Sequence, residues 1–464
     1  MFAFTILVAI TAIVSATQES IPRYLDPARS IDERVANLVG RMTLEEKVGQ
    51  LNWPCVYVDE LGSDIPTKRE SCRKFAGGLL VEGLGPAGGF FTLANTILQE
   101  GPRQQALYFN ELQKIAEERT RLKIPLTQVE EGTHGLMCSG GTVFPEGPGL
   151  GSTWNPELIE RIFAAAAKEA RAVGIHELFT LVVEPNRDPR LGRNQETFSE
   201  DPLLCSRMAE AIVRGVQGND PAAPDKAVAG LCHYPGQSQP VSGMEQGAME
   251  TSERTLREVF LPPWEAGIRE SGALGVMATY PEIDGIPAHA SRFILTDILR
   301  GELGFRGVVL SEGAGFQTLL TRGLAKTQKE AGPLALSAGV DVGITFEPAY
   351  MIPLIENVRE GRVSMELIYR AVRRVLEQKF RLGLFENRYV DPDRAVEARN
   401  NKEHRDLALE AARESLVLLR NEGSLLPLKR SLKRIAVIGP NADDPRNQLG
   451  DYISDVITQD IVTV

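Results

Sequence analysis

The chain has 464 residues, of which 43% are hydrophobic and 24% charged, a globular composition in a chain longer than one ordinary domain. Its 62 acidic and 51 basic residues give a formal net charge of -11, without a lysine and arginine cluster that could neutralise a phosphate backbone. These features exclude a disordered protein and argue against a nucleic-acid partner. They leave the oligomeric state open.

Residues 2–16 form an uncharged apolar and hydroxyl stretch that ends in the small residues Val14, Ser15 and Ala16. This pattern predicts a signal peptide and hence a secreted or periplasmic protein. The alternative is a ragged N-terminal extension of a cytoplasmic protein. The stretch is too short for a membrane span, and no later stretch is long and apolar enough to be one, so we expect no membrane partner.

The five cysteines are odd in number and widely spaced, without a Cys-x-x-Cys pair. They therefore give no zinc signature, and a chain of this size needs no disulfide framework. The glycine-rich stretch 83–89 lacks the glycine spacing of a dinucleotide-binding loop. No metal or cofactor is predicted from these residues.

Strand-like and helix-like segments alternate along most of the chain. The helix starts are marked by capping boxes at Ser30 with Glu33 and Thr43 with Glu46, and by Asn155 as an N-cap. The predicted strands are residues 77–81, 125–129, 179–184, 228–233, 274–280, 307–312 and 339–345. This alternation predicts an α/β protein with a (β/α)8 TIM-like barrel, and a doubly wound sheet is the alternative.

We expect the barrel to occupy residues 24–385 and a linker to occupy residues 386–405. A strong helical pattern over residues 406–419 and an apolar strand pattern over residues 434–440 then indicate the start of a second α/β layer. One helix and one strand cannot bury enough surface to stand alone. The segment 406–464 is therefore predicted to be the incomplete beginning of an α/β sandwich domain, and the chain to be a fragment.

Polar clusters follow five successive predicted strands, at residues 130–135, 187–202, 232–236, 279–282 and 311–313. The carboxyl ends of parallel strands meet at one face, so the side chains of these clusters should converge. Carboxylates accept hydrogen bonds from hydroxyls, while arginine and histidine donate them. The five clusters together therefore predict recognition of a neutral polyhydroxylated ligand, although each residue alone would more often have a structural role.

Several ordered segments resemble glycoside hydrolase family 3, the β-glucosidase and β-xylosidase family, from about Tyr24 onwards. The matching segments are residues 41–51 (RMTLEEKVGQL), 142–145 (TVFP), 187–202, 252–258 (SERTLRE), 261–263 (LPP), 282–287 (EIDGIP), 416–423 (LVLLRNEG) and 425–428 (LLPL). Together, in this order, they are highly specific.

The resemblance implies a barrel followed by an α/β sandwich, and retaining hydrolysis of β-glycosidic bonds without a metal or organic cofactor. It places Glu312 at the nucleophile and Glu131 at the acidic residue that binds sugar hydroxyls. The other positions that it places along the sugar pocket are Arg193, Cys232, His233 and Tyr280. The implied partner is a carbohydrate, either a β-glucoside or a β-xyloside.

Two residues depart from the family pattern. The family nucleophile is normally aspartate, and the longer Glu312 carries its carboxylate ~1.5 Å further, for which the small Gly313 could leave room. Cys232 stands where the family usually has lysine, so we expect weaker binding of sugar hydroxyls.

The general acid is not assigned by the resemblance. In most of the family it comes from the second domain, and the matching region would lie beyond Val464. A histidine and aspartate pair on a barrel loop is the alternative, but residues 237–240 (QSQP) contain neither. The leading hypothesis is thus a β-glucosidase. The alternatives are a β-xylosidase, because Glu131 could crowd a hydroxymethyl group, and a catalytically impaired sugar-binding barrel.

Overall fold

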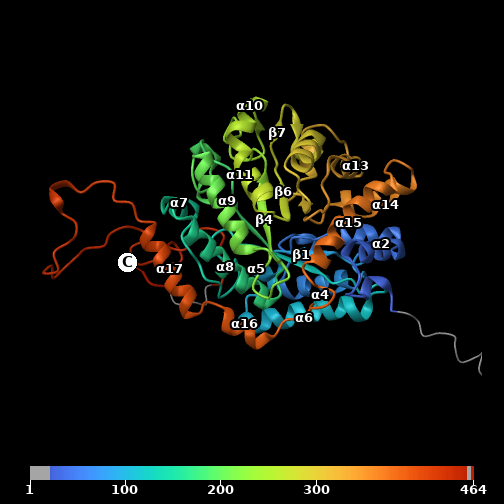
Figure 1. The fold of residues 1–464 in the computed structure, drawn as a ribbon, viewed down its shortest axis with the longest axis horizontal. Coiled ribbons are helices and arrows are strands. Elements are labelled where there is room, and N and C mark those ends of the chain that lie inside the picture. Colours follow the sequence, from blue (N-terminus) through green and yellow to red (C-terminus); the bar gives the residue numbers. More distant parts are fainter. Residues whose placement is uncertain (1–20, 457–460, 464) are drawn as a thin grey trace, which may run out of the picture.

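The computed structural model describes residues 21–456 and 461–463, so the predicted signal peptide lies outside the described residues. Six parallel strands form the central sheet in the order β1-β2-β3-β4-β6-β9. They are β1 (Gly89–Phe91), β2 (Thr127–Glu131), β3 (Glu177–Val182), β4 (Val228–Tyr234), β6 (Gly275–Ala278) and β9 (Val308–Leu310). The sheet curls into a half-barrel with helices packed around it, which makes this an α/β fold (Figure 1).

Two further segments lie alongside the edge strands of this sheet. Isolated parallel bridges join Cys55 to Phe91 of β1, Leu310 of β9 to Val342, and Asn52 to Gly343. The Trp53 amide donates to the Gly343 carbonyl over 3.0 Å, and the Ser311 amide donates to the Val342 carbonyl over 2.8 Å. The predicted strand over residues 339–345 is therefore present only as these bridges.

The prediction of a strand over residues 77–81 is wrong. Gly77 instead caps helix α4 (Ile65–Ala76), and Leu79 is 72% exposed, so this segment cannot serve as a buried strand. The first strand of the sheet is β1, at the end of the glycine-rich stretch. A Cβ atom on Gly89 would stand 2.1 Å from the Thr127 carbonyl oxygen, so the close approach of β1 to β2 requires glycine there.

The helices that surround the sheet begin where their capping residues predict. Ser30 and Thr43 form complete capping boxes with Glu33 and Glu46, and the Asn155 side chain accepts from the Leu158 amide. The remaining α-helices are α2 (Ile31–Arg41), α3 (Leu44–Gln50), α5 (Leu93–Ile97), α6 (Pro102–Arg119), α7 (Gly147–Ser152), α8 (Pro156–Val173), α9 (Pro202–Val216), α10 (Glu253–Thr255), α11 (Pro262–Glu265), α12 (Gln317–Thr321), α13 (Gln328–Ala338), α14 (Ile352–Arg359), α15 (Met365–Arg381), α16 (Pro392–Ala398) and α17 (Lys402–Glu414). No helix in the described part of the chain is both long and apolar enough to cross a bilayer.

Short 3-10 and π-helical segments join these elements. They are η1 (Arg23–Leu25), η2 (Asp59–Leu61), η3 (Pro189–Leu191), η4 (Asn194–Glu196), η5 (Leu256–Phe260), η6 (Ala266–Glu270), η7 (Ala288–Ala290), η8 (Phe293–Glu302), η9 (Pro348–Tyr350) and η10 (Glu422–Ser424). Among them, η3 and η4 belong to the connection after β3.

A small second sheet lies in the connections after β4 and β6. Its strands are β5 (Ala248–Met249), β7 (Glu282–Ile283) and β8 (Ile286–Pro287), with β7 parallel to β5 and antiparallel to β8. Asp284 and Gly285 turn the β7–β8 hairpin with φ of 54° and 76°, values typical of a tight type I′ turn. This hairpin fixes the far end of the long connection between β4 and β5.

Residues 386–405, predicted to be a linker, contain α16 and the first turn of α17. A buried network ties this region to the body of the protein through Glu169 of α8. Its carboxylate accepts from the Asn400 amide over 3.0 Å and the Thr142 hydroxyl over 2.6 Å, and lies 2.7 Å from His404 Nδ1. The linker is thus a packed part of the body.

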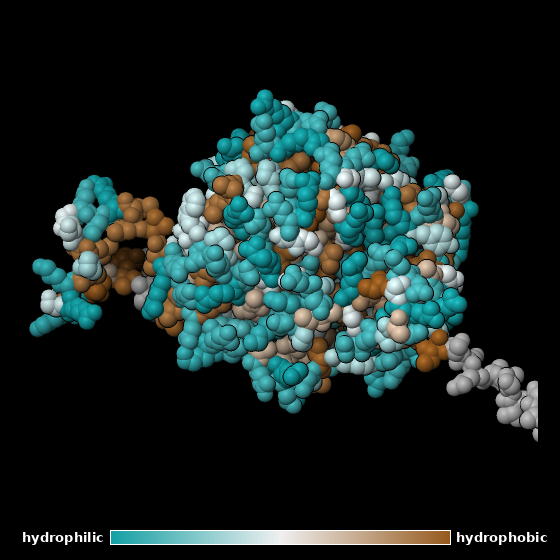
Figure 2. Space-filling model, viewed as in Figure 1, coloured by the Kyte–Doolittle hydropathy of each residue, from teal (hydrophilic) through white to brown (hydrophobic). Residues whose placement is uncertain are grey.

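The strand predicted over residues 434–440 is also wrong. This segment forms no ladder with any described residue, and its apolar side chains are open to solvent, with Ile438 90% exposed. Figure 1 shows the chain after α17 leaving the body as an open loop, and Figure 2 shows apolar surface along that loop. The apolar pattern that predicted a strand needs neighbouring strands, which this part of the structure does not supply.

We predict that the stability of the fold depends on Glu177 at the start of β3. Burial raises the pKa of this carboxyl to about 8, although Gln378 donates a hydrogen bond to it over 2.7 Å. Between about pH 4.5 and pH 8 the folded protein keeps a proton that the unfolded chain releases, so its stability falls as the pH rises. Glutamine carries no proton to lose, so this fall should be absent from Glu177→Gln. The difference in the free energy of unfolding between Glu177→Gln and the unchanged protein should therefore shift by about 1–3 kcal/mol in favour of the variant from pH 5 to pH 9.

Urea unfolding at several pH values measures this difference, with the exposed Glu397→Gln as the control. Parallel pH profiles for the unchanged protein and Glu177→Gln would contradict it.

Candidate active site

Glu312 follows β9 directly and is 3% exposed. The backbone there is held on both sides of the carboxylate. Ser311 accepts from the Ile344 amide through its hydroxyl over 3.1 Å, and the Glu312 amide donates to His289 Nε2 over 3.1 Å. The position of this side chain is therefore set by packed, hydrogen-bonded backbone at the end of a buried strand.

Three donors surround one oxygen of the Glu312 carboxylate. Gln237 Nε2 donates to Oε1 over 3.2 Å, His233 Nε2 lies 3.3 Å from the same oxygen, and Arg193 Nη1 lies 3.8 Å from it. The second oxygen, Oε2, is buried and has no hydrogen-bond partner among the described residues. Buried polar atoms are rarely left unpaired, so Oε2 is the position to which a ligand would be expected to bind.

Arg193 reaches this site from the connection after β3, where it precedes η4. It donates to Glu196 through Nε over 2.5 Å and through Nη2 over 2.6 Å, and it also donates to Glu245. Burial alone lowers the pKa of this guanidinium, but the hydrogen bond to Glu196 and the surrounding carboxylates outweigh burial and raise it. Arg193 is therefore a permanent positive charge among acidic side chains.

The surroundings shift the pKa values of the neighbouring groups in opposite directions. Burial raises the pKa of Glu312 well above its usual range, and the charge of Arg193 opposes this. Burial and then Arg193 lower the pKa of His233 well below its usual range, so its imidazole is neutral. Burial and then the charge of Glu196 raise the pKa of Glu131 to about 8. The site thus holds carboxyl groups that resist ionisation around one fixed cation.

The other predicted site residues lie near this centre with different contacts. Tyr280 follows β6 and donates its hydroxyl to the Gly313 carbonyl over 2.6 Å. Glu131 ends β2 and interacts with Arg193 through its charge. Cys232 in β4 is buried and donates its thiol to the Thr180 carbonyl over 2.9 Å, while burial raises its pKa well above the usual range. Cys232 therefore contributes a neutral thiol that is occupied within the sheet.

The connection between β4 and β5 carries Gln237 and Glu245 into the site. Its first turn is held by Glu184, which accepts from the Gly236 amide over 2.7 Å and from Trp264 Nε1 over 2.8 Å. Burial raises the pKa of Glu184 to about 7. Gln237 is thereby held against Glu312.

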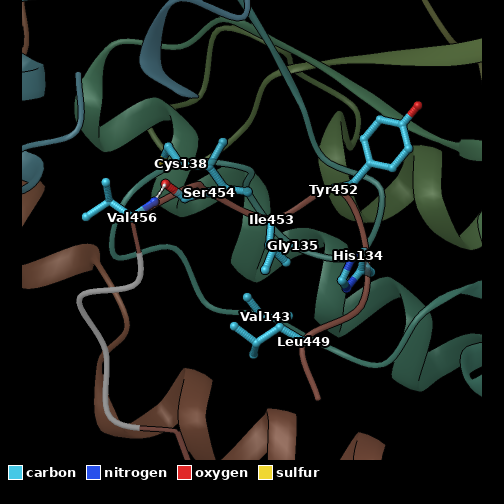
Figure 3. Close-up of a pocket in the computed structure, with 10 residues that line it drawn as sticks. His134, Gly135, Cys138, Val143, Leu449, Tyr452, Ile453, Ser454 and Val456 are labelled. Carbon is cyan, nitrogen blue, oxygen red and sulfur yellow. Dashed lines mark hydrogen bonds between the residues drawn. The ribbon is translucent and has the colours of Figure 1, made fainter. Parts of the chain in front are cut away.

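The chain near its C-terminal end also contributes to the site. Tyr452 accepts a hydrogen bond from Arg193 Nη2 over 2.9 Å, while the Asp451 carbonyl lies 2.5 Å from His134 Nε2. Figure 3 shows Leu449 and Ile453 against the loop after β2, with the Tyr452 ring pointing away from them. Residues more than 250 positions apart along the chain therefore meet at Arg193.

Sequence reasoning did not single out Glu196, Gln237, Glu245, His289 or Tyr452. Glu196 belongs to the segment 187–202, which resembles the family, but the resemblance gave this residue no role. The other four residues lie in connections between elements, and the sequence does not indicate the path of those connections. No three His, Cys, Asp or Glu side chains are grouped to hold a metal ion within residues 21–456 and 461–463.

A half-barrel of parallel strands with polar side chains converging after β2, β3, β4, β6 and β9 defines an α/β protein with its candidate site at the carboxyl ends of the strands. The chain belongs to glycosyl hydrolase family 3. Residues 43–378 match the family's N-terminal domain, and residues 416–464 match its C-terminal domain.

Two curated relatives illustrate the similarity. A putative beta-xylosidase of Formosa agariphila is 32% identical over 459 residues, which cover 97% of this chain and 59% of the relative. A periplasmic beta-glucosidase of Salmonella typhimurium is 33% identical over 438 residues, which cover 93% of this chain and 53% of the relative. The chain thus spans little more than half the length of these relatives.

Two solved structures share the fold. The β-glucosidase EmGH1 from Erythrobacter marinus matches with a TM-score of 0.80 and 34% identity over 89% of this chain and 53% of that one. The beta-glucosidase from Listeria innocua in complex with glucose matches with a TM-score of 0.80 and 30% identity over 92% of this chain and 57% of that one.

We predict that the Glu312 backbone keeps its position only if residue 315 has no side chain. A Cβ atom at Gly315 would lie 2.2 Å from Nε2 of His289, the atom that accepts from the Glu312 amide. Gly315→Ala should therefore displace His289, cost about 1–3 kcal/mol of stability and weaken ligand binding at Glu312.

Gly301→Ala is the matched control, because the nearest atom to its Cβ would be the Thr296 carbonyl oxygen at 3.6 Å. Thermal unfolding of the two variants measures the difference. Equal melting temperatures for the two variants would contradict the prediction, because His289 would then move without a loss of stability.

Proposed function

We propose that this protein is a glycoside hydrolase of the β-glucosidase type, which cleaves terminal β-glycosidic bonds in short oligosaccharides or β-glucosides with retention. Glu312 is the nucleophile. The observation that carries this proposal is the state of its carboxylate, which has one oxygen held by donors while the other is buried and unpaired among the described residues. A carboxylate in this state can form a bond to an anomeric carbon with little rearrangement.

The residues around Glu312 supply what a sugar requires. Arg193 and the neutral His233 offer donors, while Glu131 lies at the end of β2 and Tyr280 follows β6. Glu131 carries a carboxyl with a pKa of about 8, so near neutral pH it can donate to a sugar hydroxyl as well as accept from one. Cys232 adds no cation, because its thiol is neutral and bonded to Thr180.

Glu312 must lose its proton to attack. Its burial opposes ionisation, and the nearby positive charge of Arg193 favours it. A sugar that excludes water from the site would strengthen the attraction between the two groups. Arg193 therefore both orients the substrate and favours the ionised nucleophile.

We also propose the architecture that the family implies. The bridges at residues 52–55 and 342–343 would complete the half-barrel as its seventh and eighth strands. The barrel would occupy residues 24–385 and the linker residues 386–405, and residues 406–464 would begin an α/β sandwich. A secreted or periplasmic location is supported by the periplasmic beta-glucosidase among the relatives.

A β-xylosidase is the second candidate function. The glutamate at position 131 reaches further into the pocket than an aspartate would, which favours a pentose without a hydroxymethyl group. The putative beta-xylosidase among the relatives supports the same possibility.

We predict that Glu312→Gln lowers the turnover of an aryl β-glucoside by about 10³-fold or more, because an amide cannot act as the nucleophile. The exposed Glu250→Gln serves as the control and should keep full activity. Steady-state hydrolysis, with circular dichroism to verify folding, makes the measurement. Equal activity of the two variants would refute the assignment, and tight sugar binding without turnover in the unchanged protein would instead indicate a sugar-binding barrel.

We predict that Glu131→Asp shifts the preference from β-xylosides towards β-glucosides by about tenfold, because removing one methylene makes room for the hydroxymethyl group. The ratio of kcat/KM for matched aryl glucosides and xylosides gives the answer. An unchanged ratio would place the hydroxymethyl group away from Glu131.

A further inference from the structure

The loop that follows β2 is held at its tip by a buried arginine from the segment between α16 and α17. Arg399 is 7% exposed, and its Nη1 donates to the Cys138 sulfur over 2.6 Å and to the Ser139 carbonyl over 2.9 Å. Its Nη2 donates to Gln105 of α6 over 3.1 Å, and the Glu169 carboxylate lies 3.9 Å from its Nε. A buried charge is costly unless its surroundings compensate it, so this loop and this arginine fix each other's positions.

The chain beside Arg399 is fixed as well. Asn400 has a φ of 44°, close to the left-handed region that asparagine tolerates, and its amide donates to Glu169 over 3.0 Å. The same carboxylate accepts from both the amide and the hydroxyl of Thr142, near the far end of the loop, over 3.0 and 2.6 Å. The loop is therefore held at two points, its tip and its far end.

The loop between these two points is compact. The Phe144 amide donates to the His134 carbonyl over 2.9 Å, and His134 Nδ1 lies 2.7 Å from the Phe144 carbonyl. A Cβ atom on Gly135 would stand 2.1 Å from the Thr142 carbonyl oxygen, so the two limbs of the loop touch without space between them. Because closely packed parts of a protein transmit strain, a shift at the tip should carry over to the start of the loop.

The start of this loop is Glu131, the last residue of β2. Its carbonyl accepts from the Met137 amide over 3.0 Å, which joins it directly to the loop. The Glu131 carboxylate makes no hydrogen bond with any residue that the structure describes, and the charges of Glu196 and Arg193 act on it from a distance. The position of this carboxylate is therefore set by its own backbone, and the backbone by the loop.

We propose that Arg399 is a positioning residue for substrate binding, which holds the loop after β2 so that Glu131 faces the sugar. This inference rests on the proposed function, in which Glu131 binds sugar hydroxyls. Arg399 itself does not touch the sugar and acts through Glu131. The segment 386–405, predicted to be a linker, thus also sets the affinity of the site.

The test is a double-mutant cycle on the affinity for methyl β-glucoside and methyl β-xyloside. Ligand-observed NMR, which also measures weak binding, gives the affinities, and Glu312→Gln as the common background keeps the ligands intact. Arg399→Met should weaken binding by about 10- to 100-fold, because a misplacement of about 1 Å can cost that much. In a chain that also carries Glu131→Ala, Arg399→Met should weaken binding by less than about threefold, because coupled sites are not additive.

Arg300→Met is the matched control. The Arg300 side chain is 10% exposed and is bound to Asp341 over 2.6 Å, and it makes no contact with the loop after β2 among the described residues. Its loss should lower stability, as that of Arg399 does, but leave the affinity for both glycosides unchanged. Arg399→Lys keeps the charge without the fork of donors, so it should lose less affinity, and it carries the test if Arg399→Met does not fold.

The outcomes separate this inference from the proposed function. Equal losses of affinity in Arg399→Met and Arg300→Met, no loss in Arg399→Met, or full additivity with Glu131→Ala would overturn the positioning role and leave the proposed function intact. Retained turnover in Glu312→Gln would overturn the proposed function, while the affinity cycle would still decide the role of Arg399. If neither glycoside binds to the unchanged protein, both fail.

Discussion

The arrangement of the site depends on one half-buried guanidinium, that of Arg193. Burying a carboxylate away from water is costly unless a partner compensates its charge, and Arg193 contacts Glu196, Glu245 and Glu312 at once. The elements that supply these acids are the connections after β3 and β4 and the end of β9, and Tyr452 closes the group from the C-terminal region. Without this cation the three carboxylates would repel each other, and the connections that carry them would have no common point of attachment.

The three carboxylates differ in how closely they contact the positive charge of Arg193. Glu196 is bound through both oxygens and is fixed, whereas Glu312 keeps one oxygen unpaired among the described residues and Glu245 is partly open to solvent. The same cation thus contacts a carboxylate that is fully bonded, one that keeps an unpaired oxygen among the described residues and one that is partly exposed. Identical side chains at this site therefore have different surroundings, which is the condition under which paired carboxylates take different roles.

The sequence predicted the parts of the fold and of the candidate site that depend on short-range patterns, such as helix caps and polar residues at strand ends. Glu312, Arg193 and His233 were placed together because polar residues after parallel strands must share one face. The strand prediction over residues 77–81 was wrong because the apolar pattern there is common to strands and helix ends. The close contact of β1 with β2 at Gly89 makes β1 the first strand of the sheet instead. Glu245 was missed because its position depends on Glu184 holding Gly236 and on the β7–β8 hairpin, contacts that span many residues.

The most direct test of the central claim is to trap the glycosyl ester with a 2-deoxy-2-fluoro-β-glucosyl fluoride and locate it by mass spectrometry of the digested protein. The account predicts one sugar per chain, attached to the peptide that contains Glu312. Attachment to Glu131, Glu196 or Glu245 instead, or turnover with inversion and without a trapped ester, would contradict it.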